Sequence, residues 1–380
     1  MAGVIGSDEF VLSGVEFVEI TDRVRALSIN RGKNRDFDRF DAGSLSVELN
    51  NFDRAFDPLF VSSPFAGNIV PRRRVRVSVD DVPQYVGTIN DWNIGFEQGG
   101  VSVASASAAD EFTLLALQDV VPGTATPQTT GARVEAVLDM DSVRWPEDRR
   151  QIDAGVSVLG ADEFDGNALE YLHKVEGSEQ GLLFIAKNGD LVFQDRLATP
   201  TVDDVTVFAD DGSGIPFETA ELDYGIELLF NRIEVTSPFG TAVSDSLLSQ
   251  TRYGIIQQGF DTLLAAGPQL QDFADFVAGR YAEPELRFAS LRIAVDTLGS
   301  ADRATVLGLE IGDVAEVKLT PNGIAPQVSR FQLVIGVSHE ITPEAHFMNV
   351  VLGDLQTSLF VIGDAEFGTI GEGAPGVLGF

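Results

Sequence analysis

Three histidines, His173, His339 and His346, are the residues whose chemistry would suit metal binding or acid–base catalysis. His339 begins the run HEITP, which starts like the H-E-x-x-H helix of zinc proteases. Pro343 occupies the position of the second histidine and would also break the helix. We therefore expect His339 and His346 to be ordinary residues near a strand end, and His173 to be an ordinary residue of a short helix.

Other chemistry-bearing patterns are equally weak. Residues 209–214, ADDGSG, gather carboxylates and glycines, but they lack the alternate acidic positions and the distant Glu of an EF-hand. No phosphate-binding loop and no nucleophile elbow is present. With no Cys, the chain has neither disulfides nor a thiolate metal site. The sequence therefore predicts no catalytic, metal-ligating or cofactor-binding residue, and no cofactor.

The charge balance restricts the partners. Lys and Arg number 26 against 58 Asp and Glu, a net charge of −32, which opposes binding to phosphate backbones or anionic lipid. A hydrophobic fraction of 44% with 22% charged residues indicates a folded chain. We expect no stable membrane insertion, because no run reaches the roughly 18 apolar residues of a span and the start lacks a signal-peptide pattern.

The first hundred or so residues show the patterns of β-strands. Apolar and polar residues alternate over 43–50 and again over 72–79, the period of a half-buried strand. After the turn DDVP, a further strand is expected over 85–92. We therefore predict an N-terminal antiparallel β domain over 1–107, closed as a barrel or folded as a small sandwich.

Helical patterns begin near Ser107, which stands three residues before Asp110 as in a capping box. Two more short helices are expected in TGARVEAVLDM and DGNALEYLHKVEGSEQG. The run LLFIAKNGDLVFQDR then joins two apolar stretches by Asn188-Gly189, a strong hairpin signal. Residues 108–199 are therefore predicted to form an inserted α+β domain.

β patterning returns from about residue 200, and a second β-barrel domain is predicted over 200–357. One helix is expected near 268–281. Its apolar stripe consists of Leu270, Phe273, Ala274, Val277 and Tyr281. Residues 358–380 form a Gly-rich apolar tail that we expect to lie along another surface.

The segment LNNFDRAFDPLFVSSPFAGNIVP, residues 49–71, resembles a signature of tail-tip proteins from long, non-contractile-tailed bacteriophages, often called minor tail proteins. The matching positions are Leu49, Asn51, Asp53, Phe56, Asp57, Pro58, residues 63–69 and Pro71. Arg54-Ala55 stands where many relatives have Gly-Arg. Segments 167–196 and 360–380 resemble the helix-plus-hairpin and the C-terminal tail of the same proteins more weakly.

The resemblance implies a baseplate-hub fold: mainly β with a smaller α+β part, two β-barrel tail-tube-like domains and an inserted helical and hairpin domain. It implies a non-enzymatic homotrimer in the tail tip of the virion, whose six barrels extend the six-fold tail tube around the DNA exit channel. The expected partners are the distal tail protein ring, the C-terminus of the tape-measure protein, and other minor tail or fibre proteins. Viral DNA would pass without specific binding.

Within this resemblance, the loop rigidified by Pro58, Pro64 and Pro71 is the candidate interface or locking loop. Its candidate residues are Phe52, Phe56, Phe60, Phe65, Arg72, Arg74 and Arg76. The phenylalanines would anchor in their own barrel or in the next one. The arginines would pair with carboxylates of this chain or of a neighbouring copy, or would protect a solvated edge strand.

An acidic wall would repel DNA, so we expect a pore face of Asp, Glu and small polar residues, with Arg72 to Arg76 facing away from it. The alternative is that the acidity lies over the outside and serves solubility. Two other functions stay open: a distal tail protein forming a six-fold ring, and a hub with cell-wall hydrolase activity.

Overall fold

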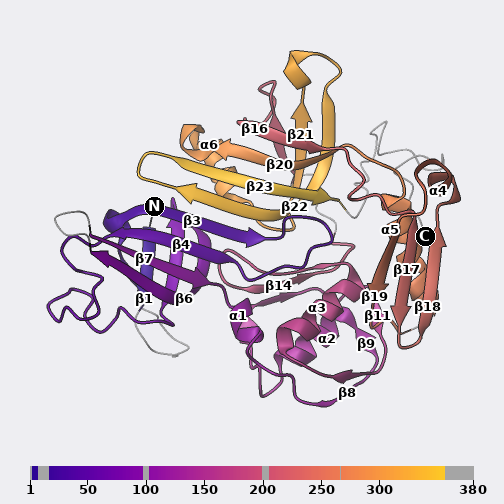
Figure 1. Ribbon diagram of the computed structural model, residues 1–380, viewed down its shortest axis with the longest axis horizontal. Coiled ribbons are helices and arrows are strands. Elements are labelled where there is room, and N and C mark those ends of the chain that lie inside the picture. Colours follow the sequence, from indigo (N-terminus) through magenta and orange to yellow (C-terminus); the bar gives the residue numbers. More distant parts are fainter. Residues whose placement is uncertain (1, 7–16, 97–101, 199–204, 266, 356–380) are drawn as a thin grey trace.

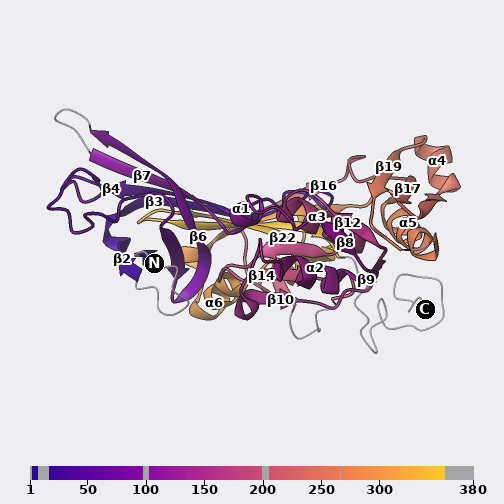
Figure 2. The same ribbon diagram turned by 90° about the horizontal axis from the view of Figure 1, so that it is seen from below.

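The computed structural model describes residues 2–6, 17–96, 102–198, 205–265 and 267–355 (Figure 1). The predicted tail, 358–380, lies outside the described residues. The molecule is elongated, with an N-terminal β unit at one end and a small sheet with helix α5 (Gly267–Tyr281) at the other (Figure 2). A long sheet connects the β units, and an α+β part packs beside it.

The N-terminal β unit has the strand order β3-β4-β7-β6-β5, extended beyond β5 by β1 and β2. All neighbours are antiparallel. The strands are β1 (Ala2–Gly6), β2 (Phe17–Glu19), β3 (Val24–Gly32), β4 (Ser44–Asn50), β5 (Arg74–Val79), β6 (Val82–Phe96) and β7 (Ser102–Ala109), with a 3-10 turn at Thr21–Arg23. The three strands expected over 43–50, 72–79 and 85–92 are therefore confirmed.

The C-terminal β unit has the strand order β16-β20-β23-β22-β21, and β15 pairs with β21 in parallel. The strands are β15 (Thr206–Ala209), β16 (Thr219–Asp223), β20 (Arg287–Ala294), β21 (Val314–Leu319), β22 (Val328–Ile341) and β23 (His346–Asp354). Helix α6 (Ser300–Gly308) follows β20, and 3-10 turns lie at Val295–Thr297 and Pro321–Gly323.

The two β units share one topology. Each unit contains a three-strand meander with a long central strand, which is β5-β6-β7 in the first unit and β21-β22-β23 in the second. Two strands from earlier in the chain continue the sheet beyond the third strand of the meander: β4 and β3 in the first unit, and β20 and β16 in the second. The five strands are antiparallel to their neighbours in both units. The chain thus contains two copies of one five-strand unit.

An irregularity in the long central strands fixes the equivalence of the two units residue by residue. The β6–β7 register shifts between Ile89 and Asp91, and the β22–β23 register shifts between Val334 and Gly336. Each long strand therefore has one extra residue at the same point, as in a β-bulge. This equivalence aligns residues 91–96 of β6 with residues 336–341 of β22.

The two units join edge to edge. β3 pairs antiparallel with residues 336–341 of β22, along the edge that β21 occupies at residues 328–333. The result is a 13-stranded sheet over one hydrophobic core, to which both units contribute. The mainly β class with a smaller α+β part is confirmed. The described strands close no barrel, because the edge of β3 that faces away from β4 pairs with β22 of the other unit rather than with a strand of its own unit.

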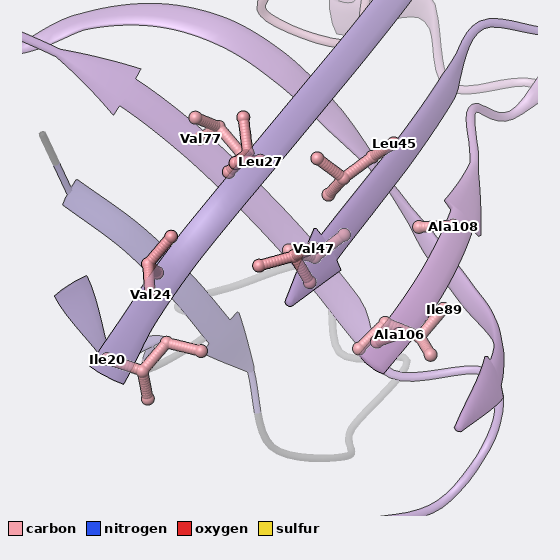
Figure 3. Close-up of a pocket in the computed structure, with 10 residues that line it drawn as sticks. Ile20, Val24, Leu27, Leu45, Val47, Val77, Ile89, Ala106 and Ala108 are labelled. Carbon is pink, nitrogen blue, oxygen red and sulfur yellow. The ribbon is translucent and has the colours of Figure 1, made fainter. Parts of the chain in front are cut away.

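The interior of the N-terminal unit is packed with side chains. Figure 3 shows apolar side chains from several strands converging on a cavity of about 20 Å³. Such a volume holds about one water molecule, and its purely apolar lining offers no hydrogen-bond partner. The cavity is therefore a packing defect of the core, and any channel must lie outside the unit.

The α+β part follows β7. Its helices are α1 (Phe112–Leu115), α2 (Thr130–Leu138) and α3 (Ala168–Glu179). Its strands are β8 (Gly123–Ala125), β9 (Gln128–Thr129), β10 (Arg150–Ile152), β11 (Val158–Leu159), β12 (Asp162–Phe164), β13 (Leu182–Ile185) and β14 (Leu191–Gln194), with a 3-10 turn at Glu147–Arg149. The two expected helices and the β13–β14 hairpin at Asn188-Gly189 are confirmed.

The predicted capping box at Ser107 is wrong. Ser107 lies in β7 and pairs with Ser46 of β4, so it is part of the sheet rather than the start of a helix. The helix begins later because the Asp110 carboxylate accepts from the Phe112 N–H at 3.0 Å. Helix α1 is consequently only four residues long.

A second small sheet contributes to the core of the α+β part. It contains β17 (Arg232–Ser237), β18 (Gly240–Asp245) and β19 (Gln257–Asp261), followed by α5, and α4 (Leu247–Tyr253) lies between β18 and β19. Helix α5 buries its predicted apolar stripe in the hydrophobic cluster that α2 and α3 also line. The domain boundaries at 107 and 199 therefore stay a proposal, and we add residues 228–282 to the α+β packing unit.

Candidate functional site

The β4–β5 loop, residues 51–73, lies at the end of the molecule formed by the N-terminal unit (Figure 2). Its backbone makes successive turns, in which the N–H groups of residues 54, 57, 60, 63 and 66 each donate to the carbonyl three residues earlier. The loop is therefore an ordered element rather than an extended linker.

Side chains of the signature hold these turns. The Asn51 side-chain oxygen accepts from the Phe56 N–H at 2.8 Å. The Asp57 carboxylate accepts from the Leu59 N–H at 2.9 Å, and Ser63 Oγ accepts from the Phe65 N–H at 3.0 Å. Each of these side chains caps one turn of the loop, which gives the signature positions Asn51, Asp57 and Ser63 a structural role.

Phe56 anchors the loop to its own β unit. Its ring is fully buried, lies 5.2 Å from the Phe65 ring and 5.9 Å from the Trp92 ring of β6, and is nearly parallel to both. The Arg23 guanidinium lies 5.8 Å from the Phe56 and Phe65 ring centroids. Arg23 also donates two hydrogen bonds to Asp53, at 2.9 and 3.0 Å, and these lower the pKa of Asp53.

The outer side of the loop exposes apolar side chains. Phe52 is 78% exposed, Leu59 85% and Val61 89%. Phe60 is half-buried beside the Arg54 guanidinium, 5.0 Å from its ring centroid. Of the four candidate phenylalanines, the structure thus places Phe56 and Phe65 in the unit's own packing and leaves Phe52 outside it.

The candidate arginines do not form one row. Arg72 is exposed, with a φ of 71°, and ends the loop. Arg76 is exposed and lies over the Phe17 ring at 4.7 Å. Arg74 pairs with Glu111 at 3.1 Å, and Glu111 also pairs with Arg149 at 2.8 Å. Arg74 therefore connects β5 to the α+β part of the same chain.

Buried charge also connects the units beneath the sheet. Arg31 of β3 is buried and pairs with Glu310 at 2.7 Å, and Glu310 accepts from the Lys187 N–H of the β13–β14 turn at 2.8 Å. Nearby, the buried Asp110 carboxylate accepts from the Gly43 N–H at 2.6 Å. Burial nevertheless raises the pKa of Asp110 to about 7.

One face of the long sheet carries small polar residues. Residues directly opposite one another on neighbouring strands lie on the same face, so the strand registers define cross-strand rows. One row of this face is Thr219, Arg292, Asn349, Ser338, Asn30, Ser44, Ala109 and Thr88. The next row runs through Glu340, Ser28, Ser46, Ser107 and Asp91, and beyond Glu340 it continues with the apolar Phe347 and Ala294.

Apart from Ala294, no residue of these two rows is buried, and both rows cross the junction between the two β units. Arg292 is the one cation among them, and Glu340 lies 3.2 Å from it. The alternation of Ser and Asn with apolar residues is visible in the sequence, but the rows depend on strand pairings that the sequence does not give. We call these two rows the polar face.

The three histidines contact neighbouring side chains of the chain. His339 Nδ1 and His346 Nε2 lie 3.0 Å apart in the protein interior, where one ring donates and the other accepts. Burial lowers the pKa of His346 to about 4 and that of His339 well below its usual value. His173 in α3 packs edge-on against Phe112, with centroids 6.1 Å apart. His339 lies in strand β22, so the H-E-x-x-H comparison fails on structure as well.

Hydrogen bonds to Asp211 hold the acidic turn at 209–214. The Asp211 carboxylate accepts from the Ser213 N–H at 2.9 Å and from Gln327 at 3.0 Å. Within the described ranges, no three His, Cys, Asp or Glu side chains are grouped so that they could hold a metal ion. In the same part of the chain, no helix is long and apolar enough to cross a membrane.

Comparisons with known proteins identify the class of fold. No family model and no curated protein sequence matches the chain. Among solved structures, it is similar to the 43 kDa tail protein of prophage MuSo2 from Shewanella oneidensis, with a TM-score of 0.59 and 12% identity over 94% of this chain and 98% of that chain. The tail protein from Neisseria meningitidis MC58 gives a TM-score of 0.61 and 12% identity over 93% and 96%.

The chain therefore has the fold of phage tail proteins. A third similar structure is the E. coli c3393 protein, a component of the type VI secretion system described as similar to the T4 bacteriophage tail proteins gp27 and gp5. Its TM-score is 0.51, with 10% identity over 87% of this chain and 73% of that chain. Within the class, the fold is the baseplate-hub form.

Proposed function

We propose that the chain is a structural protein of a phage tail tip, a baseplate hub that extends the tail tube. The observation that carries the proposal is the duplicated five-strand unit, joined edge to edge by β3 and β22 into one sheet. Two successive ring positions are then filled by one chain. The tail-protein fold supports the same function.

The duplication favours a hub over a distal tail protein with one unit per subunit. A ring of six equivalent units needs six single-unit chains but only three chains of this kind. We therefore propose a homotrimer, bordered by the distal tail ring and the tape-measure C-terminus on one side and by fibre or receptor-binding proteins on the other. The proposed role is architectural, which the fold shared with tail proteins supports.

We further propose that the polar face lines the DNA exit channel. A duplex is held where Lys and Arg contact its phosphates and release condensed counterions. The polar face offers hydroxyls, amides and carboxylates, and Glu340 and Glu218 lie 3.2 and 3.6 Å from its one arginine. With a net charge of −32 on the chain, such a wall would let DNA slide past.

A cryo-EM reconstruction of the tail tip tests the hub by its copy number. We expect three copies of the chain in one ring, with six β units in near six-fold arrangement. Six copies in the ring would support the distal tail protein, and a single copy on the tail axis would contradict both assignments.

A further inference from the structure

The internal junction between the two β units buries a specific set of side chains. Leu27 lies opposite Ile341, and Ile29 lies opposite His339. These four residues are at most 5% exposed. On the other side of the strands, Ser28 faces Glu340 on the polar face. The junction therefore combines backbone pairing, a buried apolar side and a continuous polar side.

Two strand segments equivalent to the halves of this junction, one in β16 and one in β6, have no such partner among the described strands. β16 is the equivalent of β3, and in the described part of the chain no strand pairs with its outer edge. Residues 91–96 of β6 are the equivalent of 336–341 of β22, and beyond β5 no described strand pairs with their outer edge. One molecule thus presents both halves of a second junction.

The unpaired halves expose the residues that the internal junction buries. The registers carry the equivalence outward from the bulges, so that Ser107, Ser46 and Ser28 match Val351, Ser290 and Glu221. Leu222 of β16 is therefore equivalent to Ile29, which is 2% exposed, but Leu222 is itself 38% exposed. Phe96 of β6 is equivalent to Ile341, which is 1% exposed, but is itself 58% exposed. Unpaired edges with exposed apolar side chains favour addition of another strand.

We propose that β16 of one chain pairs antiparallel with residues 93–96 of β6 of a second copy, in the register of the internal junction. Ala220 would lie opposite Phe96, Glu221 opposite Gly95, Leu222 opposite Ile94, and Asp223 opposite Asn93. The apolar pairs would then extend the core. In this register no two carboxylates face each other directly. The space above Gly95, opposite Glu221, is open, since a Cβ built at Gly95 would meet only Val103 O, at 3.9 Å.

The contact is heterologous, because different edges of the two chains meet, and such contacts generate rings when the rotation closes. If every junction repeats the internal one, units from successive chains alternate around the ring and the polar face becomes continuous. This inference rests on the proposed hub and names the surface by which its copies meet.

Disulfide trapping in purified phage tails tests this pairing. The chain has no Cys, so the double variant Asp223→Cys with Asn93→Cys carries only the designed thiols. Directly opposite residues in an antiparallel pair have Cα atoms about 4.5–5.5 Å apart, within the range that a disulfide spans. Within one chain the two strands are separated by seven strand spacings, about 34 Å along the sheet, so a disulfide between them is expected to join two chains.

We expect mild oxidation to convert more than half of the chains into dimers and trimers that a reductant separates again. The matched control is Thr219→Cys with Asn93→Cys, which displaces one thiol by four residues, about 13 Å along the strand. It should give at least tenfold less disulfide-linked dimer and trimer. Equal cross-linking of both pairs, or none in tails that contain a ring of this chain, would overturn the pairing but leave the hub intact. Absence of the chain from purified tails would overturn the hub itself.

Discussion

Replacing Phe56 by Ala should lower the free energy of unfolding by about 3–5 kcal/mol, the usual loss for a fully buried phenylalanine. The Phe56 ring is 0% exposed and packs against both Phe65 and Trp92. Its removal leaves a cavity between the β4–β5 loop and β6 that the capped turns of the loop cannot easily fill. Urea unfolding of the purified variant measures the change.

Phe52→Ala is the matched control, since Phe52 belongs to the same loop and is 78% exposed. We expect its stability to lie within about 0.5 kcal/mol of the wild type. Comparable losses for the two variants would show that Phe56 does not anchor the loop. A loss of tip assembly by Phe52→Ala without a loss of stability would identify the outer side of the loop as a docking surface.

Glu310→Gln should lower the free energy of unfolding by about 3 kcal/mol, because it removes the charge that compensates a buried arginine. Arg31 is 3% exposed, and its Nη1 lies 2.7 Å from Glu310 Oε1. The substitution keeps the size of the side chain, so the loss reports on charge rather than on packing. Glu310 also accepts from the Lys187 N–H, so the substitution should loosen the contact between the β units and the β13–β14 hairpin.

Asp141→Asn serves as the control for this change. The Arg144–Asp141 pair has a similar separation, 2.9 Å, but its side chains are 74% and 90% exposed. Exposed ion pairs contribute little, so no measurable change is expected. If Glu310→Gln is as stable as the wild type, Arg31 does not depend on Glu310, and the account of the buried junction is wrong.

The alternating strands and amphipathic helices could be predicted from the sequence. Their periodicity is local, so β4, the β13–β14 hairpin and the α5 stripe follow from a few neighbouring residues. The 49–71 signature likewise pointed to the tail-protein fold, and its Asn51, Asp57 and Ser63 prove to cap successive turns. Near Ser107, the local helix signal was wrong because pairing with β4 decides that position.

What depends on long-range pairing could not be predicted. The equivalence of β6 and β22 has no obvious trace in their residues, and it appears only through the common bulge and strand order. Arg25–Glu48 and Glu218–Arg292 occupy equivalent positions in the two units with their charges exchanged, so residue identity hides the repeat. Nor could local patterns show that Arg74 and Arg149 share Glu111 across two parts of the chain.

The most direct test of the central proposal is which surface of the ring faces the DNA channel in a side-chain-resolution map of the tail tip. We predict that the channel wall is the polar face, with Ser28, Ser46, Ser107 and Asp91 of each chain towards the axis and Arg72, Arg74 and Arg76 away from it. A channel lined by those arginines, or a polar face turned to the outside of the tail, would contradict the proposal.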